Sequence, residues 1–266
     1  ADRWPTLLRA NVLALAACGA LLALAPAAQG ARVASGLDPT VSGGVLAWGR
    51  QDGSLVVRPP GGPDRTYTGA EPALDGEYLA YRNENGIRIV RWQGGDPVAQ
   101  VDGNVSLPAL DWPRVAFVRR DATHKRLVVR NLQTGSHRVY ASTALSVDLG
   151  RPSLRHGKLA WHVATRGSSR ISLLTLSTGR RRTVARSKVN LLCNPAVYSS
   201  RILWVEARSG VSRVKLGWAG GGPVRTIGRI NGRDLNYWTT ALGSGVAYTT
   251  RWTMSTGVAS VYRNGF

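Results

Sequence analysis

Cysteine is scarce in this 266-residue chain, which contains only Cys18 and Cys193. Cys18 lies in the apolar N-terminal segment, so removal of that segment would leave one thiol and no internal disulfide. A scaffold held together by disulfides is therefore not expected. Because 43% of the residues are hydrophobic, a chain of this length can instead be stabilised by a buried core.

Acidic residues are also few, with 15 Asp and Glu against 35 Lys and Arg, which gives a net charge of +20. The basic residues are nearly all arginine, since the chain has only four lysines, and such a bias can also arise in a GC-rich genome. The isoelectric point near 11.3 predicts attraction to polyanions at low salt, with nucleic acid, anionic lipid and anionic cell-wall polymer as candidates.

Motifs for known chemistry are lacking: the chain contains neither G-x-S-x-G nor H-E-x-x-H. His156 and His162 occur in one repeat without a third ligand nearby, so no metal site is predicted. Cys193 has no evident basic partner and is expected to be a small buried apolar residue. Residues 220–223, Gly-Gly-Gly-Pro, lack the Lys-Ser/Thr of a phosphate loop and indicate a hairpin turn. No catalytic residue, metal or cofactor is predicted.

Long hydrophobic runs are absent after residue 30, and residues 1–30 read as a targeting segment. Arg3 and Arg9 precede an apolar stretch from Val12 to Ala25, and 25–27, Ala-Pro-Ala, fits a cleavage site. We expect a signal peptide, with a retained N-terminal apolar anchor as the alternative and lipidation at Cys18 as a third possibility. Export to the periplasm, cell envelope or exterior follows as an expectation.

A six-fold repeat dominates the rest of the chain. The pattern is a proline, an aliphatic residue two positions later, and the sequence aliphatic–Ala–aromatic at positions seven to nine, with Thr239 in place of the sixth proline and Leu203 in place of the fifth alanine. The first position is occupied by Pro39, Pro72, Pro108, Pro152, Pro195 and Thr239, and the aromatic position by Trp48, Tyr81, Phe117, Trp161, Trp204 and Tyr248. Repeat spacings of 33 to 44 residues are typical of propellers and solenoids.

Each repeat indicates four short strands separated by turns, and no helical periodicity appears after residue 30. The sequence therefore predicts an all-β fold, a six-bladed β-propeller of four-stranded antiparallel blades over residues 31–266. The sixth repeat lacks its fourth strand, and residues 31–35 resemble the fourth strands of the other repeats. We expect this N-terminal strand to pair with the last blade and close the ring, with an open ring as the alternative.

The pattern resembles the TolB-type, or WD40-like (PD40), β-propeller repeat of exported bacterial proteins. The fourth repeat carries the resemblance best, through Pro152, Leu154, Gly157, 159–161 (Leu-Ala-Trp) and 178–179 (Thr-Gly). The family's Ser-Pro-Asp-Gly turn is mostly missing, and only Asp75 and Gly76 keep its second half. The resemblance implies the fold across residues 31–266, whereas the family's role in envelope assembly through protein partners carries over poorly.

A ring of polar residues is predicted at the mouth of the central channel, because the position before each repeat proline recurs in the innermost strand. This position holds Asp38, Glu71, Leu107, Arg151, Asn194 and Trp238. Asp38, Glu71, Arg151, Asn194 and Trp238 are the predicted binding residues, and the alternative is that they cap strand ends and pair with each other. Two carboxylates facing one site would permit acid–base chemistry.

Runs of basic residues, such as 180–182 (Arg-Arg-Arg) with Arg186 and Lys188, fall on predicted outer strands. They fit either a polyanion-binding surface or charge that protects a sheet edge from pairing. The hypothesis favoured by the sequence is an exported, non-enzymatic and monomeric binding scaffold for a protein or polymer partner, with no specific nucleic acid. A channel hydrolase or lyase for saccharide or peptide, and electrostatic polyanion binding through the arginine-rich surface, are the alternatives.

Overall fold

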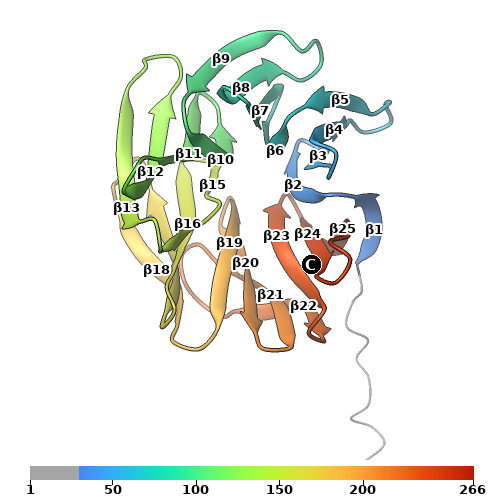
Figure 1. Cartoon of the computed structure of the whole chain (residues 1–266), viewed down its shortest axis with the longest axis vertical. Coiled ribbons are helices and arrows are strands. Elements are labelled where there is room, and N and C mark those ends of the chain that lie inside the picture. The colour runs from blue at the N-terminus through green and yellow to red at the C-terminus, as the bar shows by residue number, and fades with distance from the viewer. Residues whose placement is uncertain (1–29) are drawn as a thin grey trace, which may run out of the picture.

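In a computed structural model of the chain, residues 30–266 form 25 strands and no helix. These are the residues described here, so the predicted signal peptide or anchor, including Cys18, lies outside the described residues. The strands form six antiparallel sheets that stand side by side around a central axis as the blades of a propeller (Figure 1). The fold class predicted from the repeat is confirmed. Residues 30–266 therefore contain no helix that is long and apolar enough to cross a membrane.

The first three blades each contain four consecutive strands, ordered from the channel to the rim. Blade 1 comprises β2 (Leu37–Ser42), β3 (Val45–Gly49), β4 (Ser54–Arg58) and β5 (Arg65–Thr68). Blade 2 comprises β6 (Ala70–Asp75), β7 (Tyr78–Asn83), β8 (Gly86–Arg91) and β9 (Pro97–Asp102). Blade 3 comprises β10 (Val105–Asp111), β11 (Arg114–Arg120), β12 (His124–Asn131) and β13 (His137–Ala144).

The other three blades depart slightly from this plan. In blade 4 the innermost strand is split into β14 (Asp148–Leu149) and β15 (Ser153–Arg155), followed by β16 (Lys158–Ala164), β17 (Ser169–Thr175) and β18 (Arg181–Ser187). Blade 5 comprises β19 (Leu191–Tyr198), β20 (Arg201–Arg208), β21 (Val211–Trp218) and β22 (Arg225–Asn231). Blade 6 comprises β23 (Leu235–Leu242), β24 (Val246–Thr253) and β25 (Ala259–Gly265), with β1 (Ala31–Ser35) at its rim.

Ring closure by the N-terminal strand is confirmed. β1 pairs antiparallel with β25, with Ala31 opposite Arg263 and Ser35 opposite Ser260. Segments more than 200 residues apart in the chain therefore share one sheet (Figure 1). The pairing covers an edge of β25 that would otherwise expose unpaired N–H and C=O groups.

The core lies between adjacent blades, where the repeat aromatics are buried. Trp161 of blade 4 is fully buried and packs against Ala109 and Ala116 of blade 3. The same position packs on the preceding blade in four other copies, while Tyr248 is half-buried and packs with the blade 1 cluster instead. Burying a large side chain contributes about 1.5–3 kcal/mol, so the repeat pattern encodes the contacts that hold the blades together.

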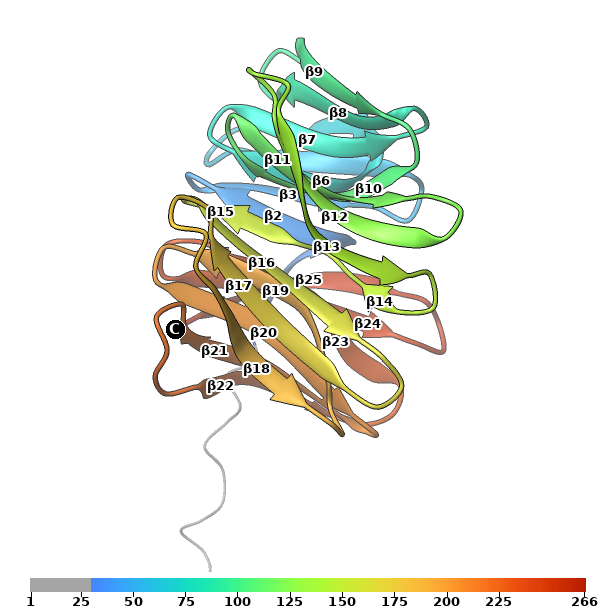
Figure 2. The same ribbon diagram turned by 90° about the vertical axis from the view of Figure 1, so that its left-hand side faces the viewer.

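The antiparallel order of strands gives the disc two faces. The turns after each second strand lie on one face, called face A, which carries Gln51, Thr165 and Gly257. The turns after each first strand lie on the opposite face, called face B, which carries Gly76 and Gly157. Figure 2 shows the disc from its side, with the outer strands of blades 3 and 4 toward the viewer.

Candidate functional site

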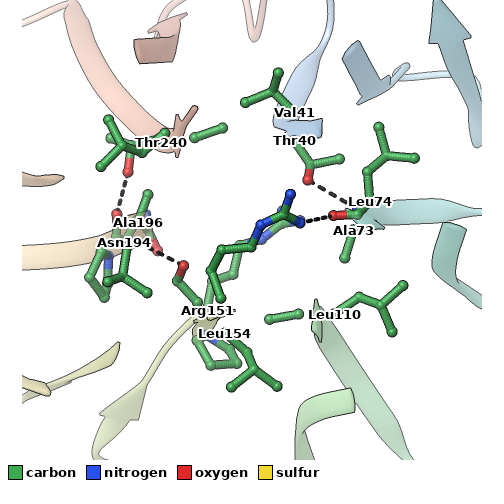
Figure 3. Close-up of a pocket in the computed structure, with 18 of the residues that line it drawn as sticks. Thr40, Val41, Ala73, Leu74, Leu110, Arg151, Leu154, Asn194, Ala196 and Thr240 are labelled. Carbon is green, nitrogen blue, oxygen red and sulfur yellow. Dashed lines mark hydrogen bonds between the residues drawn. The ribbon is translucent and has the colours of Figure 1, made fainter. Parts of the chain in front are cut away.

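The central channel is narrow. It is lined by the repeat prolines, small residues and Arg151 and Arg155, and its cavity volume is about 60 Å³ (Figure 3). A volume of this size accommodates a few water molecules, whereas sites for small ligands measure roughly 300–1,000 Å³. As it stands, the channel therefore has no room for a saccharide or peptide substrate.

Arg151 of blade 4 spans the channel to the other side of the ring. Its Nη1 lies 3.0 Å from Oδ1 of Asp38 in blade 1, and both side chains are about 11% exposed. Its Nη2 donates a 2.5 Å hydrogen bond to the carbonyl of Pro72 in blade 2. One guanidinium thus connects three blades, and the charge of Arg151 is neutralised in place by Asp38.

Arg155, also from blade 4, makes a second crossing closer to face B. Its Nη1 lies 2.7 Å from Oδ1 of Asp75 and donates to the carbonyl of Leu74 at 3.0 Å. Its Nη2 donates to the hydroxyl of Ser42 at 2.7 Å. The view of the channel in Figure 3 includes the hydrogen bond to Leu74. The two arginines cross the channel from blade 4 to blades 1 and 2 at different depths, which accounts for its small volume.

The five predicted binding residues do not form one cluster. Asp38 and Arg151 pair directly, and Asn194 lines the channel beside them. Glu71 instead lies 3.0 Å from Nε of Arg82 and accepts a 2.6 Å hydrogen bond from the N–H of Leu107. The side chain of Trp238 lines a different cavity, on face A between blades 6 and 1.

A backbone feature recurs at the position before the repeat proline. Asp38, Glu71, Leu107 and Asn194 have φ between 47° and 58°, in the left-handed region, directly before a proline. The pairing register of the first strand shifts at this point in five blades, as in a β-bulge that re-aims a side chain. The side chains of Glu71 and Asn194 consequently bond to the backbone of the next blade.

Other polar residues that the sequence analysis did not select complete this ring of inter-blade bonds. Asp75 accepts from the N–H of Trp112 at 2.7 Å, and Asp111 accepts from the N–H groups of His156 and Gly157. Ser153 accepts from the N–H of Val197 at 2.9 Å. Asp75 and Asp111 end the first strands of their blades, and this shared position in the repeat is the signal that could have identified them.

Trp238 is the predicted binding residue with the most accessible side chain, which is 44% exposed. Its ring contacts the ring of Trp252 edge-to-face, with centroids 5.1 Å apart. The two tryptophans, Leu37 and Gln51 line a mostly apolar cavity of about 200 Å³. A tryptophan beside an apolar hollow at a polar rim is a common anchor for a partner side chain.

His162, Asp148 and Cys193 lie near one another but lack the properties of a nucleophile and its base. Nε2 of His162 is 3.0 Å from Oδ2 of Asp148, and this hydrogen bond holds the pKa of Asp148 below its usual value. Nδ1 of His162 accepts the N–H of Asn194 at 3.1 Å, so it cannot also take a proton from a thiol. Burial raises the pKa of the Cys193 thiol to about 12. Cys193 is therefore a neutral core residue at physiological pH.

Carboxylates do not converge on a shared site in the channel. The Asp38 carboxylate is paired with Arg151, and the Glu71 carboxylate is held by Arg82 and the Leu107 N–H. Residues 30–266 contain no cluster of three or more His, Cys, Asp or Glu side chains suited to hold a metal ion. Asp38 and Glu71 therefore hold the ring of blades together, and their two carboxylates are not arranged as an acid–base pair.

Similarity to known proteins is restricted to the fold. No family profile and no curated protein matches the sequence. A chain of a nidogen/laminin complex superposes with a TM-score of 0.58 at 14% identity, covering 79% of this chain and 90% of that chain. TolB from Acinetobacter baumannii gives 0.57 at 12% identity, covering 96% of this chain and 69% of TolB.

A third solved structure is the β-propeller domain of the trilobed protease from Pyrococcus furiosus, with a TM-score of 0.54 at 8% identity. The match covers 87% of this chain and 96% of that domain, which is described as having an open velcro topology. The ring described here is instead closed through β1 and β25. These likenesses support a TolB-like β-propeller fold.

Proposed function

We propose that this protein is an exported, non-enzymatic binding scaffold that presents its faces and loops to a protein or polymer partner in the cell envelope or outside the cell. The observation that carries the proposal is the channel crossed by Arg151 and Arg155, because a filled channel directs function to the surface. A rigid ring of inter-blade hydrogen bonds suits a role in which the surface is presented in one conformation.

Within this proposal, the predicted channel-mouth residues have two roles. Asp38, Glu71, Arg151 and Asn194 hold the blades in register beneath face A, through the contacts described above. Trp238 contacts the partner directly, because its ring is accessible and lines the apolar hollow with Trp252. The polar ring thus orients the surface that carries Trp238.

The alternative function is a hydrolase or lyase that acts on a saccharide or peptide in the channel, since a propeller fold alone does not define function. It requires the Arg151 and Arg155 side chains to move and two carboxylates to converge. Asp38→Asn and Glu71→Gln would then abolish turnover of a saccharide or peptide panel. The scaffold proposal expects no turnover by the parent chain or by either variant.

Capture from an envelope extract at low and high salt tests the scaffold proposal. The immobilised protein should retain a specific component at high salt, because apolar burial around Trp238 is less sensitive to ionic strength than charge pairing. Trp238→Ala should lose that component. The control is Trp218→Ala, which removes a tryptophan of similar exposure, 40%, from the end of β21 on face B. Loss of the component from both variants alike would overturn the role of Trp238.

A further inference from the structure

A groove runs between the outer parts of blades 3 and 4 toward face B. Its first cavity, of about 230 Å³, lies between Arg138 and Tyr140 of β13 and Trp161 and Arg181 of blade 4. A second cavity of about 390 Å³ shares Arg138 and Tyr140 and extends to Arg114 and His137. β13 and β18, which border the groove, face the viewer in Figure 2. Together the cavities have the size of a ligand site.

The groove is lined by unpaired cations. Within residues 30–266, Arg114, Arg138 and Arg181 have no ion-pair partner, and no carboxylate lines either cavity. Arg138 lies over the ring of Tyr140, 5.4 Å from its centroid, and Arg181 over the ring of Trp161 at 4.7 Å. Each guanidinium thus makes a cation–π contact, and its N–H groups remain available to donate to an oxyanion.

The arginine over the buried Trp161 differs from its counterpart in blade 1. Nε1 of Trp161 has no hydrogen-bond acceptor although the residue is fully buried and lines the first cavity. The equivalent Trp48 and Trp204 also lack an acceptor, so the unpaired indole N–H is a feature of the repeat. At Trp48 the arginine over the ring, Arg58, is neutralised by Asp64 at 2.7 Å. Arg181 has no such partner, and burial together with the charge of Arg170 lowers the pKa of its guanidinium. An anion beside Arg181 would supply the counter-charge that this guanidinium lacks.

The positive charge of the disc is concentrated in the four blades that include this groove. Residues 104–266, which form blades 3 to 6 up to β25, contain 26 Lys and Arg against five Asp and Glu. Residues 30–103, which form β1 and blades 1 and 2, contain seven against nine. Like charges are even placed opposite each other in the sheet, as with Arg170 and Arg186, an arrangement that is unfavourable without an anion nearby. Such a field attracts polyanions to one side of the disc.

We propose that this groove binds a linear anionic polymer through Arg114, Arg138 and Arg181, with phosphate or carboxylate groups on a non-aromatic backbone. Guanidinium groups bind both kinds of oxyanion in a bidentate manner. Single-stranded nucleic acid fits less well, because it needs free aromatic faces for base stacking and those of Tyr140 and Trp161 are covered by arginine. The inference rests on the proposed scaffold function and gives the scaffold a second ligand, bound at a site separate from Trp238.

Fluorescence anisotropy with labelled polyphosphate and labelled polygalacturonate, added to the full chain at low and physiological salt, tests the inference. Arg138→Gln/Arg181→Gln should weaken binding about tenfold or more, since two charge-assisted contacts are removed. The control, Arg229→Gln/Arg233→Gln, removes the same charge from exposed positions of blade 5 and its following turn. It should change affinity less than about threefold, as expected for a long-range charge effect alone. Comparison of the two polymers separates phosphate from carboxylate recognition.

Several results would overturn the inference. Equal weakening by the two double variants would mean that charge acts over the whole surface, and absence of binding would exclude the polymer. Groove-dependent binding of single-stranded DNA tighter than either polymer would assign the groove to nucleic acid. If Arg181→Gln impairs folding, Arg114→Gln/Arg138→Gln replaces two exposed groove residues instead. Failure with both polymers, while an envelope component is still retained at high salt, overturns this inference alone.

Discussion

Nη1 of Arg151 lies 3.0 Å from Oδ1 of Asp38, across the channel and 113 positions away in the chain. Both side chains are nearly buried, and Arg151 also donates to the Pro72 carbonyl. Removing one partner of such a pair leaves the other charge buried and uncompensated. This contact therefore makes the stability of the ring depend on the same residues that fill the channel.

Arg151→Met should destabilise the protein by about 3–5 kcal/mol, because Asp38 would remain buried without a counter-charge. Urea denaturation followed by tryptophan fluorescence measures the free energy of unfolding. The matched control is Arg91→Met, which removes an arginine from the half-exposed pair with Glu77 and should cost less than about 1 kcal/mol. Similar losses for the two variants would contradict a buried cross-channel pair.

Removal of β1 should weaken blade 6 selectively. A chain beginning at Leu37 lacks residues 31–35, so the backbone groups of β25 that pair with them would be exposed. Hydrogen exchange of β25 amides should become much faster, while amides of β8 in blade 2 stay protected. A chain beginning at Gly30 is the control, because it retains β1. Unchanged protection of β25 in the shorter chain would refute closure by this strand.

The hydrogen bond between His162 and Asp148 should make stability fall in acid. The pKa of Asp148 is depressed in the folded protein, so its contribution is present above the unfolded pKa, near 4, and is lost as pH falls further. Asp148→Asn should remove this part of the pH dependence and cost less than about 1 kcal/mol at pH 7, because Asp148 is 57% exposed. Parallel stability curves for parent and variant between pH 6 and pH 3, set as assay conditions, would disprove the role of Asp148.

His162 itself should matter more than Asp148. His162→Ala leaves the N–H of the buried Asn194 without its acceptor, which costs about 1–3 kcal/mol before the effect of the cavity is added. Thermal or urea unfolding compares the two variants. A smaller loss for His162→Ala than for Asp148→Asn would contradict the assigned direction of these hydrogen bonds.

Cys193 should make the protein less stable in alkali. Its pKa is about 12 in the folded state against 9.0 for an unperturbed thiol, so the unfolded thiol ionises first and stability declines above pH 9. From pH 7 to pH 10 the parent should lose about 1.4 kcal/mol more than Cys193→Ala. Urea titrations at the two pH values provide the comparison, and an equal decline in parent and variant would show that Cys193 is not buried as described.

The repeat made the architecture predictable because each position of the repeat makes a similar packing contact in nearly every blade. Spacing of the prolines and aromatics indicated six blades, and Trp161 and its equivalents pack where that spacing requires. Even ring closure followed from the fourth strand missing from the sixth repeat. Hydrophobic periodicity carries this information because burial depends on a residue's own place in the strand.

The direction of the ring side chains was not predictable in the same way. Asp38, Glu71 and Asn194 share a sequence position and a left-handed φ, yet only Glu71 and Asn194 bond to the next blade, whereas Asp38 pairs with Arg151 across the channel. The cross-channel reach of Arg155 depends on blades 1 and 4 facing each other, which no local pattern records. The groove beside Trp161 likewise combines residues from two blades, so the arginine runs indicated charge without indicating a site.

The most direct test of the scaffold proposal is a binding titration at high salt. It measures the affinity of the captured envelope component for the parent chain, for Trp238→Ala and for Trp218→Ala. The account predicts that Trp238→Ala weakens binding roughly thirtyfold, as for an anchor residue worth about 2 kcal/mol, and that Trp218→Ala leaves it within about twofold, as for a residue outside the contact. Equal affinities for the two variants, or binding that disappears at high salt for the parent chain itself, would contradict it.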